Sequence, residues 1–97
     1  MAVVETTRFR LAPGADVDAF LRADRRVQAE FIPNHPGFLR RTTARGADGE
    51  WLVVVLWQSE EDAARSSLLA SDATQVAAFD AYIDQASVVR ARYETLD

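Results

Sequence analysis

Apolar and polar residues alternate along the first segment of the chain, and this period of two predicts a β-strand over Val3–Leu11. A second strand is predicted over Phe38–Arg45. The clearest strand is Glu50–Trp57, which is apolar at nearly every position. A last strand is predicted over Ser87–Glu94, which is rich in β-branched and aromatic residues.

Helical spacing is found between these strands. Apolar residues recur every three or four positions over residues 16–32, which predicts an amphipathic helix with Asp16 as its N-cap. A second helix is predicted to begin at Ser59, because a capping serine precedes three carboxylates. It continues through Leu69, is interrupted near residues 71–72 and then resumes. The apolar positions are Val17, Phe20, Leu21, Val27 and Phe31 in the first helix, and Val76, Phe79 and Ile83 in the resumed segment.

Turn residues separate these elements and set their order. Pro13-Gly14 ends the first strand, and a Pro-rich loop over residues 33–37 ends the first helix. Residues 46–49 form a hairpin turn, in which Asp48-Gly49 suits positive φ. The resulting order, β-α-β-β-α-β, predicts a ferredoxin-like α+β fold: a four-stranded antiparallel sheet with both helices on one face. We expect residues 1–97 to form one domain.

The third strand bears on assembly because both of its faces are apolar. The two faces are Trp51, Val53, Val55 and Trp57 on one side and Leu52, Val54 and Leu56 on the other. Two helices cover only one side of the sheet, and exposed apolar surface costs about 25 cal/mol per Å². We therefore expect a homodimer that packs sheet face to sheet face, forming a dimeric α+β barrel. The alternative is a single copy whose far face is only partly apolar, which Arg8 and Arg10 on the first strand favour.

Composition excludes several classes of protein. A hydrophobic content of 48% with 27% charged residues is typical of globular proteins. The net charge of −4 argues against nucleic acid or an anionic membrane as partner, and the absence of cysteine excludes disulfides and thiolate sites. No apolar run reaches the length of a membrane-spanning helix, and no secretory signal begins the sequence. We expect a cytoplasmic protein.

Two polar residues interrupt the apolar stripe of the first helix. Asp24 and Gln28 lie one turn apart on the side that faces the sheet. A carboxylate directed into such an interface must be paired, hydrogen-bonded or in a wet cavity. One interpretation gives Asp24 an internal partner, an arginine or a tyrosine. Another places both residues in a small-molecule pocket, and a third leaves Asp24 at an exposed helix edge.

The remaining candidates are single residues. His35, the one histidine of the chain, would suit acid–base chemistry if its pKa is unshifted, but loop histidines are more often simply solvated. It forms no multi-histidine set, so no metal site is expected. Trp57 packs in a core or interface, or stacks on a substrate. The hydroxyl of Tyr82 bonds a substrate or reaches water. No phosphate-binding or dinucleotide motif occurs, so no nucleotide or flavin site is expected.

The order of elements and two short motifs resemble the antibiotic biosynthesis monooxygenase-like family of dimeric α+β barrels. The motifs are Pro36-Gly37-Phe38 before the second strand and Trp57-Gln58-Ser59-Glu60-Glu61 after the third. The resemblance spans nearly the whole chain. It implies a homodimer in which each subunit holds a pocket between its helices and its sheet, where Asp24 and Gln28 would face. Some members oxidise aromatic polyketides to quinones with O₂ and neither metal nor flavin, and others degrade haem, cyclise polyketides or have no assigned activity.

The sequence also departs from the family pattern. Many members have a glutamate where Val55 stands, and often a histidine near Arg65 and Ser66. Haem-degrading members use that histidine and an asparagine of the first strand, where this chain has Thr6 and Thr7. The resemblance therefore disfavours haem degradation.

The leading hypothesis is a cofactor-independent, monooxygenase-like enzyme that acts on a small aromatic or polyketide-like molecule. In it, Asp24 or His35 takes the phenolic proton, Gln28 and Tyr82 bond the substrate, and Trp57 forms a pocket wall. The alternatives are a non-catalytic binding or structural homodimer, in which Asp24 is held in an internal ion pair, and a polyketide cyclase-like enzyme that needs no O₂.

Overall fold

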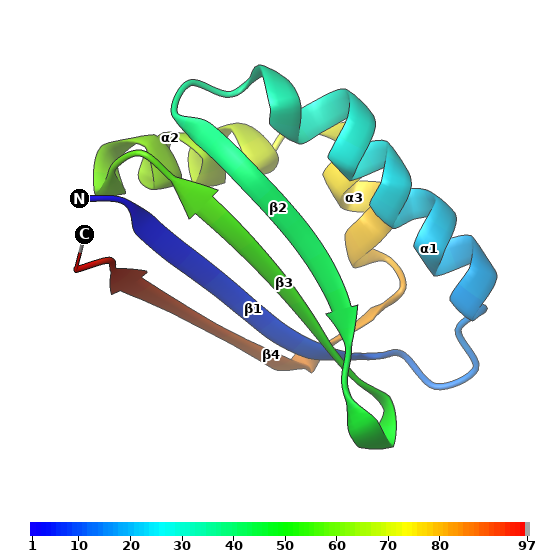
Figure 1. Ribbon diagram of the computed structural model, residues 1–97. Helices are drawn as coiled ribbons and strands as arrows, with labels where there is room; N and C mark the ends of the chain where they lie inside the picture. The colour runs from blue at the N-terminus through cyan, green and yellow to red at the C-terminus, as the bar shows by residue number, and fades with distance from the viewer. Residues whose placement is uncertain (97) are drawn as a thin grey trace.

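The protein is a twisted four-stranded sheet with its helices on one side, as seen in a computed structural model that describes residues 1–96 (Figure 1). The strands are β1 (Val3–Leu11), β2 (Phe38–Arg45), β3 (Glu50–Trp57) and β4 (Ile83–Glu94). They lie in the order β2-β3-β1-β4, and every neighbouring pair is antiparallel. This arrangement confirms the ferredoxin-like prediction.

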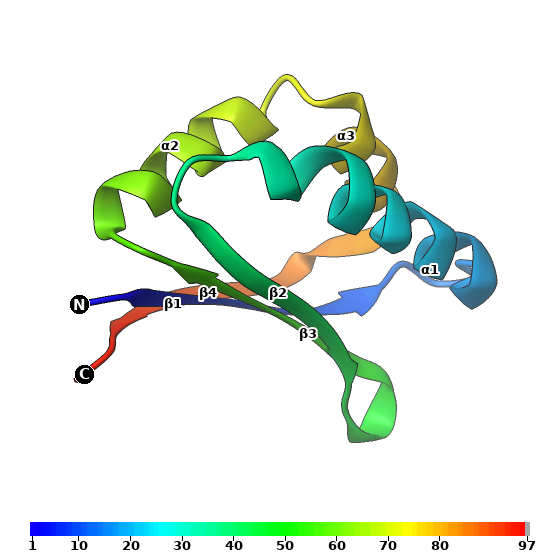
Figure 2. The same ribbon diagram turned by 45° about the horizontal axis from the view of Figure 1, so that its top comes forward.

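The helices form the second layer. They are α1 (Val17–Arg26), α2 (Glu60–Ala70) and α3 (Thr74–Asp80). All three lie above the sheet in Figure 2, and no element among residues 1–96 lies beneath it. The expected N-caps are confirmed, because Asp16 accepts hydrogen bonds from two backbone N–H groups at the start of α1 and Ser59 accepts one at the start of α2.

The first helical segment continues past α1 as a single π-helical turn, η1 (Val27–Phe31), and a short 3₁₀ turn, η2 (Ile32–Asn34). Pro33 stands in η2, after which the chain turns into β2. The predicted helix over residues 16–32 is thus helical throughout. Its final turns change winding and bring Phe31 and Ile32 over the sheet, where they line a cavity.

The hairpin between β2 and β3 contains the short turn η3 (Ala47–Gly49). Asp48 has φ 59° and Gly49 has φ 78°, so the expected positive φ angles are present at both residues.

The last strand begins earlier than the sequence suggested. Ile83, expected on the resumed helix, is the first residue of β4 and pairs with Leu11. A β-bulge follows, and the Ser87 hydroxyl accepts a hydrogen bond from the Arg10 backbone N–H at 2.8 Å. Cross-strand pairing and burial of Ile83 therefore override the helical spacing that this residue shares with Val76 and Phe79.

The core lies between the sheet and the helices. Trp57, Phe9 and Phe20 are its largest fully buried side chains. Phe20 of α1 packs edge-on against Trp51 of β3, with ring centroids 5.0 Å apart, and Phe79 of α3 contacts the same cluster. The two faces of β3 are divided as predicted, because its two tryptophans and Val53 and Val55 are buried while the other side stays partly exposed.

Candidate functional site

A cavity of about 620 Å³ opens between the helix-covered face of the sheet and α2. Three strands form its floor, and α2 with the turns η1 and η2 forms its roof. Its volume lies within the range of small-molecule sites. The lining residues are Glu5, Thr7, Phe31, Ile32, Val53, Val55, Trp57, Ser66, Ser67, Ala70, Arg90, Ala91 and Arg92.

One part of the lining is apolar. Val53, Val55 and Trp57 follow one another on the inner face of β3, and Phe31 lies across from them on η1. The indole Nε1–H of Trp57 is buried without a hydrogen-bond partner among residues 1–96.

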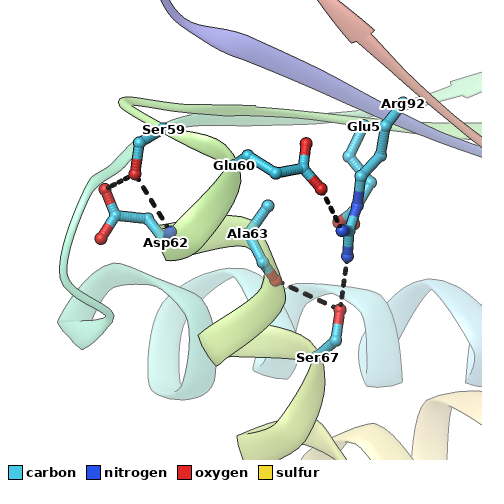
Figure 3. Close-up of polar contacts among 7 residues, drawn as sticks. All are labelled: Glu5, Ser59, Glu60, Asp62, Ala63, Ser67 and Arg92. Atoms are coloured by element: carbon cyan, nitrogen blue, oxygen red, sulfur yellow. Dashed lines mark hydrogen bonds and ion pairs between the residues drawn. The ribbon is translucent and has the colours of Figure 1, made fainter.

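The other part of the lining is polar and is organised by Arg92 of β4 (Figure 3). Its guanidinium donates to Glu5 of β1 at 2.9 Å, to Glu60 of α2 at 2.6 Å and to the Ser67 hydroxyl at 3.1 Å. The hydrogen bonds to Glu60 and then Glu5 raise the pKa of Arg92, so the group stays charged. Arg92 thus ties the start of α2 to two strands and places a fixed cation in the cavity wall.

Ser66 and His35 meet at the same cavity. Ser66 of α2 is buried and lines it, and its Oγ lies 2.8 Å from Nδ1 of His35. The imidazole packs edge-on against Phe31 with centroids 4.2 Å apart, and it stacks 6.4 Å from Trp57. Burial lowers the pKa of His35 below 6.5, so the imidazole is neutral at neutral pH. His35 therefore stands behind the cavity wall and reaches the interior through Ser66.

Asp24 and Gln28 have partners of their own. Asp24 accepts hydrogen bonds from Arg41 at 2.9 Å and from the Thr43 hydroxyl at 2.8 Å, while Gln28 accepts one from Arg41 at 3.3 Å. The side chains of Arg41 and Asp24 are only 4% and 13% exposed. This is the internal ion pair that one interpretation of the sequence proposed. Neither Asp24 nor Gln28 lines the cavity.

The predicted site residues are thus only partly brought together. Trp57 lines the cavity, and His35 contacts it through Ser66. Tyr82 packs against Phe20 at a centroid distance of 6.4 Å and does not line the cavity.

A second, smaller cavity of about 130 Å³ adjoins the first. Both are lined by Thr7, Val53 and Arg90. Asp80 of α3 lines the smaller cavity, where burial raises the pKa of its carboxyl and the charge of Arg90 opposes that rise. Arg90 therefore places a second cation beside the site.

Several polar residues of the cavity were not singled out from the sequence. They are Glu5, Ser67, Arg90 and Arg92. One signal was available, because Glu5 and Thr7 share a strand face with Val3 and Phe9 and interrupt its apolar pattern. The residues of β4 and α2 carried no such signal, since polar positions in those segments look like ordinary exposed ones.

Neither a metal-binding cluster nor a membrane span is found in the described part of the chain. No three His, Cys, Asp or Glu side chains are grouped as metal ligands among residues 1–96. No helix within these residues is both long and apolar enough to cross a membrane.

The architecture matches solved proteins at low sequence identity. SnoaB, described as a cofactor-independent oxygenase from Streptomyces nogalater, is similar with a TM-score of 0.81 and 18% identity over 99% of this chain and 94% of that one. A candidate antibiotic biosynthesis monooxygenase from Bordetella bronchiseptica gives 0.81 at 10% identity, over 98% and 97%. Another from Caulobacter crescentus gives 0.77 at 15% identity, over 99% and 91%.

The chain has the fold of the antibiotic biosynthesis monooxygenase-like proteins. The structural likeness agrees with the resemblance drawn from the sequence motifs. No protein-family model matches the sequence, and no curated protein matches it. At these identities the likeness concerns the fold, and the chemistry must be argued from this chain's own residues.

Proposed function

We propose that the chain binds a small hydroxylated aromatic molecule in the large cavity and oxygenates it with O₂, without metal or flavin. The cavity carries this proposal. Its volume of about 620 Å³ fits a molecule of a few fused rings, its β3 wall is apolar, and its β4 wall presents the cation Arg90 beside the ion-paired Arg92. Such a site suits a flat molecule that becomes anionic at one edge.

The chemistry is a four-electron oxidation of the substrate. A phenol loses its proton, and the electron-rich phenolate reacts with O₂ at a ring carbon. One oxygen atom is retained as a quinone carbonyl and the other leaves as water, so that the substrate supplies all the electrons. The protein has to deprotonate, orient and desolvate the substrate. A fold shared with SnoaB, described as a cofactor-independent oxygenase, supports this assignment.

The roles follow the geometry of the cavity. Trp57 forms the wall against which the rings pack. Of the two proton acceptors predicted from the sequence, we assign the role to His35, because Asp24 is occupied by Arg41 and Thr43. Gln28 and Tyr82, which do not line the cavity, receive no role in substrate binding.

The test places a bulky side chain into the cavity from α2, which forms part of its roof. Ala70→Phe places a ring into the lining, whereas Ala64→Phe adds the same ring to the exposed face of the same helix. With dithranol, a dihydroxyanthrone, we expect O₂ uptake and formation of the anthraquinone by the wild type. We expect at least a tenfold loss in Ala70→Phe and little change in Ala64→Phe. Wild-type uptake no faster than in protein-free buffer, or equal losses in both variants, would contradict the proposal.

A non-catalytic small-molecule carrier is the second candidate, and the Asp24–Arg41 ion pair favours it because it removes one of the two predicted bases. Such a protein would bind a dihydroxyanthraquinone, seen as quenching of tryptophan fluorescence, but would consume no O₂ with dithranol. A cyclase-like enzyme would instead turn over an open-chain polyketide in the absence of O₂.

We also propose a homodimer through the open face of the sheet. In register across β3, β1 and β4, this face carries Leu56, Val4 and Tyr93 in one row and Leu52, Arg8 and Val89 in another. Tyr93 and Val89 are 59% and 49% exposed. A second copy of the same face would remove these side chains from water.

A further inference from the structure

Ser66 and His35 form a polar contact at a place where the cavity is otherwise apolar. Phe31 and Trp57 pack on the imidazole and also line the cavity. Ser66 lines the cavity and His35 does not, and the Ser66 Oγ lies 2.8 Å from Nδ1 of the imidazole. These two side chains are 31 positions apart in sequence, so the fold alone brings them together.

The hydrogen-bonding capacity of the two groups allows a chain of three partners. A neutral imidazole has one nitrogen that donates and one that accepts, and a serine hydroxyl donates once while accepting from others. If the hydroxyl donates to Nδ1, its lone pairs remain free to accept from a hydroxyl group in the cavity. A bound phenol would then be connected to His35 through Ser66.

We propose that Ser66 and His35 form a proton relay, in which a hydroxyl of the bound aromatic molecule gives its proton to Ser66 while Ser66 gives its own to Nδ1 of His35. The step leaves a phenolate, an unchanged serine and an imidazolium, and no electrons are transferred. It rests on the proposed function and specifies how that function removes the phenolic proton. Arg90 lies in the same cavity wall and supplies positive charge for the anion that forms, whereas the charge of Arg92 is already balanced by Glu5 and Glu60.

A nucleophilic role for Ser66 is disfavoured by its position. The residue lies inside α2, where backbone N–H groups are bonded to carbonyls one turn earlier. Acyl transfer needs such N–H groups free, to stabilise the oxyanion of a tetrahedral intermediate. A relay needs no oxyanion hole.

The surroundings of His35 also indicate the kind of hydroxyl that the relay serves. Its neighbours from η1 and β3, Phe31 and Trp57, are uncharged, and on α2 the charges of Asp62 and Arg65 pair with each other at 3.5 Å. Burial therefore dominates, and the pKa of His35 lies below 6.5. An ordinary phenol, with a pKa of about 10, would hold its proton against so weak a base. The relay thus favours hydroxyls acidified by a conjugated carbonyl, as in hydroxyanthrones and hydroxyanthraquinones.

The first experiment needs no ligand. His35 is the only histidine, so its two ring nitrogens give a single set of ¹⁵N resonances. In the neutral wild-type protein we expect Nδ1 to be the unprotonated nitrogen, and we expect its resonance to move in Ser66→Ala. Ser71→Ala, at the exposed end of the same helix, is the control and should leave the resonance in place. A proton on Nδ1 would overturn the relay.

The second experiment uses alizarin, a dihydroxyanthraquinone whose visible absorbance reports its own ionisation. In the wild type, ionisation of bound alizarin should coincide with protonation of His35. In Ser66→Ala, alizarin should bind within about threefold of the wild-type affinity without protonating His35, and O₂ uptake with dithranol should fall about 100-fold. The pH profile of O₂ uptake by Ser66→Ala should also lack the inflection below pH 6.5 that we expect for the wild type.

The outcomes separate the two proposals. Dithranol turnover that is equal in Ser66→Ala and the wild type would overturn the relay and leave the oxygenase proposal in place. Coupled ionisation of alizarin without any O₂ uptake from dithranol would support the relay and overturn the oxygenase. No binding of alizarin to the wild type would overturn both.

Discussion

At the scale of single residues, the partners of Asp24 show that this carboxylate has a structural role in an ion pair. A polar residue within an apolar helix stripe is compatible with a ligand site or with a buried partner. Arg41 and Thr43 of β2 supply that partner. The ion pair thus connects α1 to β2, the edge strand of the sheet.

Removing Asp24 is expected to destabilise the protein rather than to alter its chemistry. Asp24→Ala leaves the Arg41 side chain, which is 4% exposed, without its counter-charge, and should lower the free energy of unfolding by about 3 kcal/mol in urea denaturation. The double variant Asp24→Leu/Arg41→Met should recover much of this loss. Arg26→Ala breaks an exposed pair on the same helical segment and should change little. Stability of Asp24→Ala close to that of the wild type would contradict the assignment.

Asp80 gives the stability a pH dependence whose sign is fixed. Burial raises its pKa above 3.8 in the folded state, so the folded protein holds this proton more tightly than the unfolded chain. The contribution of the protonated Asp80 carboxyl to the free energy of unfolding is fully present below pH 3.8. It is lost as the pH rises through the pKa of Asp80 in the folded state. Asp80→Asn should therefore be more stable than the wild type at neutral pH, and urea unfolding at several pH values should show the difference disappearing below pH 3.8. A variant less stable at neutral pH would contradict this.

At the scale of elements, α2 is the part of the fold that closes the cavity. Its N-terminus is capped by Ser59 and held by Arg92, whereas its C-terminal part is exposed, with Leu68 76% accessible. The start of α2 also lies against the turn that precedes β2, where Gly37 has φ 79°. A Cβ at Gly37 would lie 2.1 Å from Oδ2 of Asp62, so glycine permits this close approach.

Two glycines allow the cost of that contact to be measured. Gly14 and Gly37 share nearly the same positive φ, 78° and 79°, but a Cβ at Gly14 meets no atom within 4 Å. Gly14→Ala should therefore cost only the backbone strain, about 1 kcal/mol, and Gly37→Ala should cost clearly more in urea unfolding. It should also weaken alizarin binding, because α2 has to move. Equal losses of stability in the two variants would show that the approach of α2 to the turn is not tight.

At the scale of the whole molecule, only one of the two faces of the sheet is covered by helices. The helices cover one face of the sheet and leave the other face open (Figure 2). The open face of β3 carries Leu52, Val54 and Leu56, which stay partly exposed in one copy. No helix or strand among residues 1–96 covers them.

The expected dimer is tested by placing a charge at the centre of that face. Val54 pairs with Thr6 on the central strand β1, so Val54→Arg should convert a dimer of about twice 10.8 kDa into a monomer in sedimentation experiments at micromolar concentration. Leu68→Arg changes an exposed leucine on α2 in the same way and should remain dimeric. A wild-type protein that sediments as a monomer would overturn the dimer.

The sequence by itself determined the elements and their order, because strand alternation, helix caps and turn residues are local signals. It also divided the faces of β3 correctly, since a period of two leaves no freedom once the strand is identified. It went wrong at Ile83, where pairing with Leu11 outweighed helical spacing.

Only the tertiary structure decided which polar residues share the cavity. Ser66 meets His35, and Arg92 meets Glu5, across 31 and 87 positions of sequence, and no local pattern encodes such distances. It also decided that Asp24 is paired, because Arg41 looks in the sequence like any polar residue of an edge strand. The residues of a segment determine whether it forms a helix or a strand. A site, by contrast, depends on how several such elements pack against one another.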